Sequence, residues 1–231
     1  VPVDGERVGR LIRPTLIGFL GPDVTLDLSA SLSILPRPTL QISNLTISKK
    51  DKFSIKSQQA TVPVSVVTLL SGGLSGSSLT ITNPVITLPP SSLPETRQSA
   101  LALLSGALGA ADSLQQTPID AVAIRSGKIV VAADTQISFV ETFDADLSIT
   151  KAGRIDFDLR LPWKSEAVDV SARVDPVDPK TGSKASSLVI KSAPASISLE
   201  GALATTPDLH FAGTIDLAIK ALDRFGKWLD I

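Results

Sequence analysis

Four aspartates in the second half of the chain form the densest set of side chains that could do chemistry. Asp144, Asp146, Asp156 and Asp158 alternate with apolar residues, so in paired strands all four would lie on one face. Carboxylates at this spacing could bind calcium or perform acid and base catalysis. The opposite face of both segments is uniformly apolar, which favours a solvated outer face instead.

Other side chains with catalytic or ligand chemistry are scarce. The absence of Cys excludes disulfides, zinc–thiolate sites and thiol catalysis, and a single His excludes multi-His metal sites. His210 lies between Leu209 and Phe211, so we expect it to point away from the apolar face into solvent. Gly72-Gly73-Leu74-Ser75-Gly76 lacks the Lys and the following helix of a phosphate loop, which predicts a turn. We therefore predict no enzymatic activity, no catalytic residue, no metal and no cofactor.

Composition narrows the function classes further. The 231 residues carry 22 Lys and Arg against 23 Asp and Glu, and this balance argues against nucleic-acid binding. Hydrophobic residues make up 43% of the chain but aromatic residues only 4%, so the interior is aliphatic. No run approaches the roughly 18 apolar residues of a membrane span, and no stretch of the 231 residues has the pattern expected of a signal peptide.

Alternation of apolar and polar residues predicts strands. Residues 24–34 alternate without interruption, which predicts a half-buried strand. The apolar phase then shifts between Ile42 and Leu45, so we expect a bulge near Asn44. It shifts again at Asn83-Pro84, where the proline should confine the strand to an edge or a bulge.

Phase changes also predict three hairpins. The switch across Arg125-Ser126-Gly127-Lys128 fits a two-residue turn with Ile124 opposite Ile129. The unchanged phase across Lys151-Ala152-Gly153 fits a three-residue loop with Gly153 in the left-handed region. That register places Ile149 opposite Ile155, Leu147 beside Phe157, Asp146 beside Asp158 and Asp144 beside Arg160. An odd-length loop is expected around residues 205–208.

Helices are few. We predict one from Ser92 to about Leu114, a short one that Asp4 begins and Pro14 ends or kinks, and an amphipathic one near the C-terminus. The stripe of the last comprises Ile219, Leu222, Phe225 and Leu229. The fold class is therefore mainly β, with a curved, largely antiparallel sheet. We expect one domain over 1–231, with a sub-boundary near 89–120 where a helical insert separates sheet halves 1–89 and 120–231.

The long apolar face of this sheet has two interpretations. It is either the closed core of a sandwich or a concave surface that stays partly open and holds lipid chains. Scarce aromatic residues and abundant Val, Ile and Leu suit both.

Several segments follow one another in the order found in a known family. They are Val8-Gly9-Arg10-Leu11-Ile12 to Gly21, Pro36-Arg37-Pro38-Thr39-Leu40 with Ile42-Ser43-Asn44-Leu45-Thr46-Ile47, Leu69-Leu70-Ser71-Gly72-Gly73 with residues 79–88, Ile124 to Ile129, and Phe211 to Leu217 with a closing Trp228-Leu229. In this order the chain resembles the AsmA family of Gram-negative envelope proteins, which is related to bridge-like lipid-transfer proteins.

This resemblance implies a U-shaped groove or open barrel that conducts phospholipid and supports outer-membrane assembly. It places the chain in the periplasm, tethered to the inner membrane by an anchor upstream of Val1, so the chain is expected to be a soluble excerpt. The implied partners are phospholipid acyl chains. Joined to the apolar face, it predicts that the groove is lined by Leu26, Leu28, Leu32, Leu147, Phe157, Leu159 and Leu199. The alternative is a structural or adhesive β-domain with a closed core and a protein partner.

Overall fold

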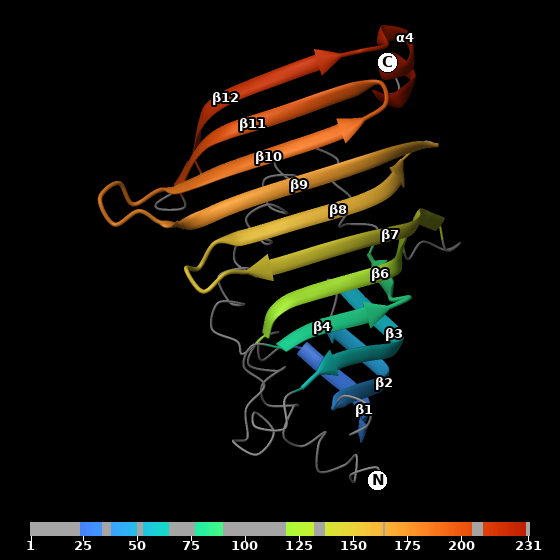
Figure 1. Ribbon diagram of the computed structural model, residues 1–231. Helices are drawn as coiled ribbons and strands as arrows, with labels where there is room; N and C mark the ends of the chain where they lie inside the picture. Colours follow the sequence, from blue (N-terminus) through green and yellow to red (C-terminus); the bar gives the residue numbers. More distant parts are fainter. Residues whose placement is uncertain are drawn as a thin grey trace. The chain divides into compact units, whose positions relative to one another are not determined.

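The computed structural model describes residues 24–33, 38–49, 53–64, 77–89, 119–131, 137–163, 165–204 and 210–229 (Figure 1). This part of the chain is almost entirely β-structure, so the predicted fold class is confirmed. The predicted helices within 92–114 and 4–14, and the predicted turn at 72–76, lie outside the described residues.

The described elements are twelve strands and one helix. Their bounds are β1 Val24–Ser33, β2 Thr39–Lys49, β3 Phe53–Pro63, β4 Ser77–Thr82, β5 Val85–Leu88, β6 Ile119–Val131, β7 Ile137–Ile149, β8 Ile155–Trp163, β9 Glu166–Val177, β10 Lys184–Ser192, β11 Ala195–Ala204, β12 His210–Ile219 and α4 Leu222–Leu229. The strands belong to one mixed sheet.

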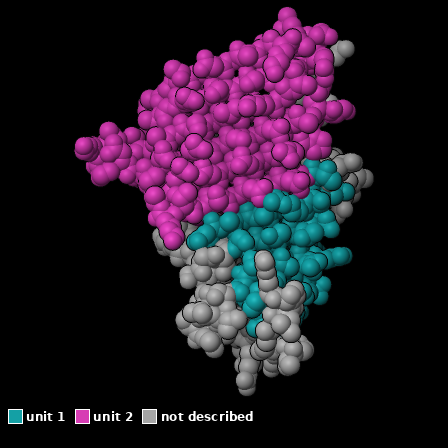
Figure 2. Space-filling model, in the orientation of Figure 1, with its two compact units in different colours: residues 1–142 teal, residues 143–231 magenta. Residues whose placement is uncertain are grey.

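The chain divides into two compact units, Val1–Thr142 and Phe143–Ile231 (Figure 2). In unit 1 the strand order is β1-β2-β3-β4-β6, and β5 pairs with β3 and β6. β4 and β5 run parallel to β6, whereas the pairs among β1 to β5 are antiparallel. Strands from both sides of the predicted helical insert therefore lie in the same unit.

The core of unit 1 is an apolar face whose side chains line up across the strands. β1 buries every second residue from Val24 to Leu32, as its alternation predicts. Two rows cross the strands in register: Leu26, Ile47, Ile55, Ile86 and Ile129, and Ala30, Ile42, Ala60, Ile81 and Ile124. Between these rows, the parity of the apolar residues reverses in every strand except β1.

Three residues with positive φ lie at this reversal. They are Asn44 (φ 54°), Asn83 (φ 50°) and Ser126 (φ 54°), in β2, between β4 and β5, and in β6. The strand registers place Asn44 beside Gln58 of β3 on one side of that strand, and Asn83 beside Gln58 on the other side. They also place Asn83 beside Ser126. We call this line of residues the reversal column. A left-handed residue reverses which side of the strand the following side chains occupy, so the apolar residues return to the core face.

Hydrogen bonds hold the reversal column together. The Ser57 hydroxyl, in a residue only 5% exposed, lies 2.8 Å from the Thr82 carbonyl oxygen and 2.9 Å from that of Gln59. The Asn83 N–H donates to the Arg125 carbonyl over 2.8 Å, and the Lys128 N–H donates to that of Pro84 over 2.8 Å. Backbone groups are thus paired where the regular ladder is interrupted.

The structure confirms one predicted irregularity of unit 1, corrects a second and excludes one of two alternatives for a third. The bulge near Asn44 is present, because the β1–β2 register shifts between Asp27 and Ser29. The hairpin at Arg125-Ser126-Gly127-Lys128 was wrong, since β6 runs straight through it. A single left-handed residue and a two-residue turn both reverse the alternation, and Ser126 does so inside a continuous strand. Pro84 was predicted at an edge or a bulge; it lies at the interruption between β4 and β5 with β3 and β6 on either side, so the edge is excluded.

Unit 2 is an antiparallel meander from the second half of β7 to β12. The β7–β8 hairpin has the predicted register, and Gly153 has the predicted left-handed φ, at 83°. Ala204 pairs with His210, so an odd number of residues, 205–209, connects β11 to β12 as predicted.

The predicted C-terminal helix is present as α4. The Lys220 and Ala221 N–H groups donate to the Pro194 carbonyl oxygen, and the Arg224 guanidinium bonds the Glu166 carboxylate. These contacts hold α4 against the β10–β11 turn and the start of β9. The helix therefore lies at the strand ends of unit 2 (Figure 1).

The reversal column predicts the effect of substituting Asn44. Asn44→Val should lower the free energy of unfolding by about 1–3 kcal/mol, because β-branched residues strongly disfavour positive φ. Asn44→Gly should change it by less than about 1 kcal/mol, since glycine adopts this φ without strain. Urea denaturation measures both, with Thr46→Val in the same strand as the control. Equal losses for the two valine variants would contradict this role for Asn44.

Candidate functional site

One side of unit 2 presents a continuous apolar surface. Its central rows are Leu147, Phe157, Ala172, Leu188, Leu199 and Ile215, and Ala145, Leu159, Val170, Ile190, Ile197 and Leu217. We call the side of β7–β12 that carries these rows the unit 2 face. Six strands at about 4.8 Å spacing give each row a span of about 24 Å. The two rows contain only apolar side chains.

Exposure increases across the unit 2 face toward β12. Ala145 in β7 is 7% exposed, whereas Leu217, at the other end of the same row, is 54% exposed. Ile215 reaches 67% and Ile219 41%. The intervening Leu159 and Leu199 are half-buried. Burial of apolar surface is therefore incomplete on this face, and the largest uncovered part lies on the last strand.

The predicted groove residues fall into two groups. Leu147, Phe157, Leu159 and Leu199 lie together on the unit 2 face and are half-buried. Leu26, Leu28 and Leu32 lie in β1 of unit 1, where they are 8%, 9% and 8% exposed and belong to the core cluster. The structure thus leaves only the first group partly accessible to a ligand.

Sequence reasoning did not assign Ile215, Leu217 and Ile219 to the candidate site. The alternation of Ile215 and Leu217 with Thr214 and Asp216 was visible, and it predicted a strand. Ile219 was assigned to the apolar stripe of the C-terminal helix, which was wrong, because it is the last residue of β12 and α4 begins only at Leu222. The missing information was that β12 pairs with β11 alone among the described strands. Strand order cannot be read from alternation.

Charged residues bound the unit 2 face at its two ends. Lys184 begins β10 opposite Leu203 and is 6% exposed. Glu166 begins β9 and bonds Arg224 of α4. Because these residues lie at opposite strand ends, the apolar rows occupy the interval between them.

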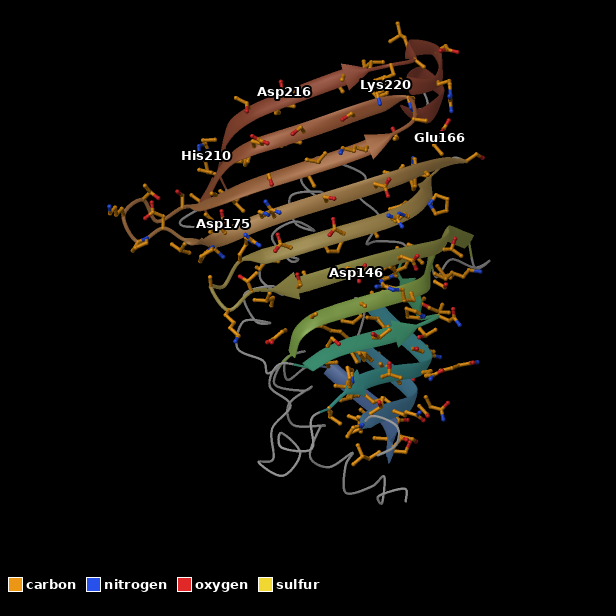
Figure 3. The ribbon with its side chains drawn as sticks, viewed as in Figure 1. Asp146, Glu166, Asp175, His210, Asp216 and Lys220 are labelled. Atoms are coloured by element: carbon orange, nitrogen blue, oxygen red, sulfur yellow. The ribbon has the colours of Figure 1, made fainter. Side chains whose placement is uncertain are left out.

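The four aspartates lie on the other side of the same strands, as predicted. Asp146 and Asp158 are exposed and pair in register, and Asp158 accepts a hydrogen bond of 2.7 Å from the Ser171 hydroxyl. Asp156 lies between the guanidinium groups of Arg154, at 3.1 Å, and Arg173, at 2.9 Å. Arg160 bonds Asp169 at 2.9 Å. Figure 3 shows Asp146 and Asp175 on β7 and β9 of this polar side.

These ion pairs set the charge states of the polar side. The hydrogen bond from Arg173 lowers the pKa of Asp156, assisted by Arg154 and opposed by partial burial. The hydrogen bond to Asp169 raises the pKa of the Arg160 guanidinium. The arrangement is that of a solvated charged surface, in which guanidinium groups bind Asp156 and Asp169 and a hydroxyl group binds Asp158.

The described residues offer little other ligand chemistry. Within them, no group of three or more His, Asp or Glu side chains is placed to hold a metal ion. His210 is exposed at the start of β12, as predicted (Figure 3). A shallow hollow of about 240 Å³ on unit 2 is lined by Arg173, Asp175 and Glu200 among others, so its charges are mixed. No helix in the described ranges has the length and hydrophobicity needed to cross a bilayer.

Comparison with known proteins adds no assignment. No protein-family model matches the chain, and a search of curated proteins finds no significant match. The likeness to the AsmA family therefore rests on the sequence segments quoted above.

The Asp156 ion pairs predict a pH dependence of stability. A carboxyl whose pKa is lowered by folding contributes stability above its unfolded-state pKa of about 3.9, and this contribution is lost as the pH falls through the folded value. Asp156→Asn should therefore lower the free energy of unfolding by about 0.5–1 kcal/mol at pH 7, a modest amount because the pairs are solvated. The difference from the unsubstituted chain should shrink below about pH 4. Urea denaturation at several pH values checks this, with Asp27→Asn in unit 1 as the charge-matched control; a difference that does not vary with pH would refute it.

Proposed function

We propose that this chain binds phospholipid acyl chains on the unit 2 face and acts without catalysis, as an envelope protein that conducts phospholipid and supports outer-membrane assembly. The observation that carries the proposal is the pair of uninterrupted apolar rows that cross six strands and remain incompletely covered. The AsmA resemblance supports it independently and adds the location, the periplasm beside the inner membrane.

The dimensions of the rows suit an extended hydrocarbon chain. Each row offers about 24 Å of apolar contact with no charged group in it. Burying a methylene contributes about 0.8 kcal/mol, so ten methylenes would supply about 8 kcal/mol before the entropy of ordering the chain is subtracted. The charged residues at the strand ends, Lys184 and Glu166, lie outside the rows and would not be desolvated by an acyl chain along them.

A structural β-domain that binds a protein partner is the second candidate. The burial of Leu26, Leu28 and Leu32 favours it, because unit 1 has the closed core that such a domain requires. Unit 1 and unit 2 thus support different candidates, and the lipid-binding test is best made in unit 2.

Substitutions on the apolar side of β8 and on both sides of β11 test the proposal. The purified chain is incubated with vesicles of phosphatidylethanolamine and phosphatidylglycerol, separated from them, and its bound phospholipid is measured by mass spectrometry. Leu159→Asn and Leu199→Asn should each reduce binding by roughly 5- to 30-fold, the equivalent of 1–2 kcal/mol of apolar contact. Ser198→Asn, on the polar side of β11, is the matched control and should leave binding unchanged.

Folding is checked in parallel by circular dichroism and urea denaturation. If the unsubstituted chain carries no phospholipid above background, or if Ser198→Asn lowers binding as much as Leu199→Asn, the unit 2 face is not a lipid site. The structural β-domain would then be the better account.

A further inference from the structure

We propose that two copies of this chain associate through their β12 strands, which pair antiparallel so that the unit 2 face continues from one copy into the other. This inference goes beyond lipid binding and does not depend on it. It rests on the edge position of β12, on the exposure of its apolar residues and on the match of the strand to itself.

β12 has the features of a pairing edge. Among the described strands it pairs with β11 alone, over ten consecutive residue pairs with no bulge. All ten of its residues are exposed. β1, at the other end of the strand order, buries its alternating apolar residues instead. An exposed edge strand that is long, regular and apolar on one side is a template for a further strand.

β12 lacks the devices that usually protect an edge. It contains no Pro and no Lys, and its one acidic residue, Asp216, lies on the polar side (Figure 3). The following helix, α4, is held at the strand ends by its contacts with Pro194 and Glu166. These contacts direct α4 toward β9 and β11, away from the open edge of β12.

The strand is complementary to a second copy of itself. A two-fold axis through Ile215 places Gly213 opposite Leu217 and Phe211 opposite Ile219 of the second copy, so large side chains meet small or apolar ones. On the polar side it places Asp216 opposite Thr214, whose hydroxyl can donate to the carboxylate. An axis through Asp216 would instead oppose two carboxylates, which is unfavourable. An axis between residues would reverse the faces of the second copy.

Gly213 contributes to this match. An added Cβ there would lie 2.2 Å from the Glu200 carbonyl oxygen, so the site accepts no side chain. Its neighbour Gly201 is equally restricted, and the Phe211 ring lies beside it. Gly213 therefore adds no side chain to the apolar side of β12 at the position that Leu217 of the second copy would face.

Single-cysteine cross-linking tests the pairing and its register. The chain has no Cys, so each variant carries one thiol. Cα atoms directly opposite in an antiparallel pair are about 4.5–5.5 Å apart, within the range for a disulfide. Ile215→Cys should therefore form a disulfide-linked dimer under mild oxidation. Residue 216 of one copy lies two residues along the strand from residue 216 of the other, which sets their Cα atoms about 8 Å apart. Asp216→Cys should therefore stay monomeric on a non-reducing gel.

Sedimentation of the full chain, with bound lipid removed, provides the second measurement. The unsubstituted chain should dimerise, and Ile215→Lys should weaken the dimer at least tenfold because it sets two ammonium groups opposite each other. Thr214→Lys should preserve the dimer, since the new charge faces Asp216 of the second copy. A monomeric unsubstituted chain, or cross-linking through Asp216→Cys instead of Ile215→Cys, would overturn the proposal; so would a chain that stays monomeric while binding lipid.

Discussion

Every strand of unit 1 must keep its apolar side chains on one face, and the reversal column is how the sequence meets that requirement. A strand normally alternates with period two, yet β2, the β4–β5 segment and β6 each change parity midway. Asn44, Asn83 and Ser126 make that change at positive φ, side by side, so these segments change parity at the same level of the sheet. If only one did so, half of its apolar residues would leave the core and face solvent. The alignment therefore protects the whole core cluster, and the Ser57 hydroxyl serves the carbonyl oxygens that the interruption leaves.

Much of the fold was predictable because alternation is a local signal. The β7–β8 hairpin followed from the unchanged phase around Gly153, and the bulge followed from the shift near Asn44. The error at Ser126 has a physical cause, because a left-handed residue and a two-residue turn both reverse the alternation of apolar and polar residues in the sequence. Only the parallel pairing of β6 with both β4 and β5, a long-range feature, distinguishes them. The candidate site was predictable to the same extent, since alternation identifies which residues share a face but not whether other residues pack over that face. Leu28 and Leu199 have the same pattern, yet one is in a closed core and the other is half-buried.

The two units therefore differ in how completely the apolar face of the sheet is covered. Unit 1 completes its core, and its apolar rows contain the most deeply buried residues, such as Ala60 at 0% exposure. Unit 2 aligns its rows as regularly but leaves them partly uncovered, with charge confined to the opposite side and to the strand ends. An incompletely buried, uninterrupted aliphatic surface is unfavourable for an isolated domain, which is why a ligand or a second copy on it is a physical expectation. The ion pairs of Asp156 and Arg160 keep the other side soluble and oriented to water.

The central claim is that the unit 2 face is the surface that phospholipid contacts. Photo-crosslinking with a phospholipid that carries a diazirine in its acyl chain, followed by peptide mapping, tests it most directly. The account predicts that the label attaches within β8, β11 and β12 at residues of the apolar rows, such as Phe157, Leu199 and Ile215. Label on the polar side, at Asp158 or Ser198, or label confined to unit 1, would contradict it.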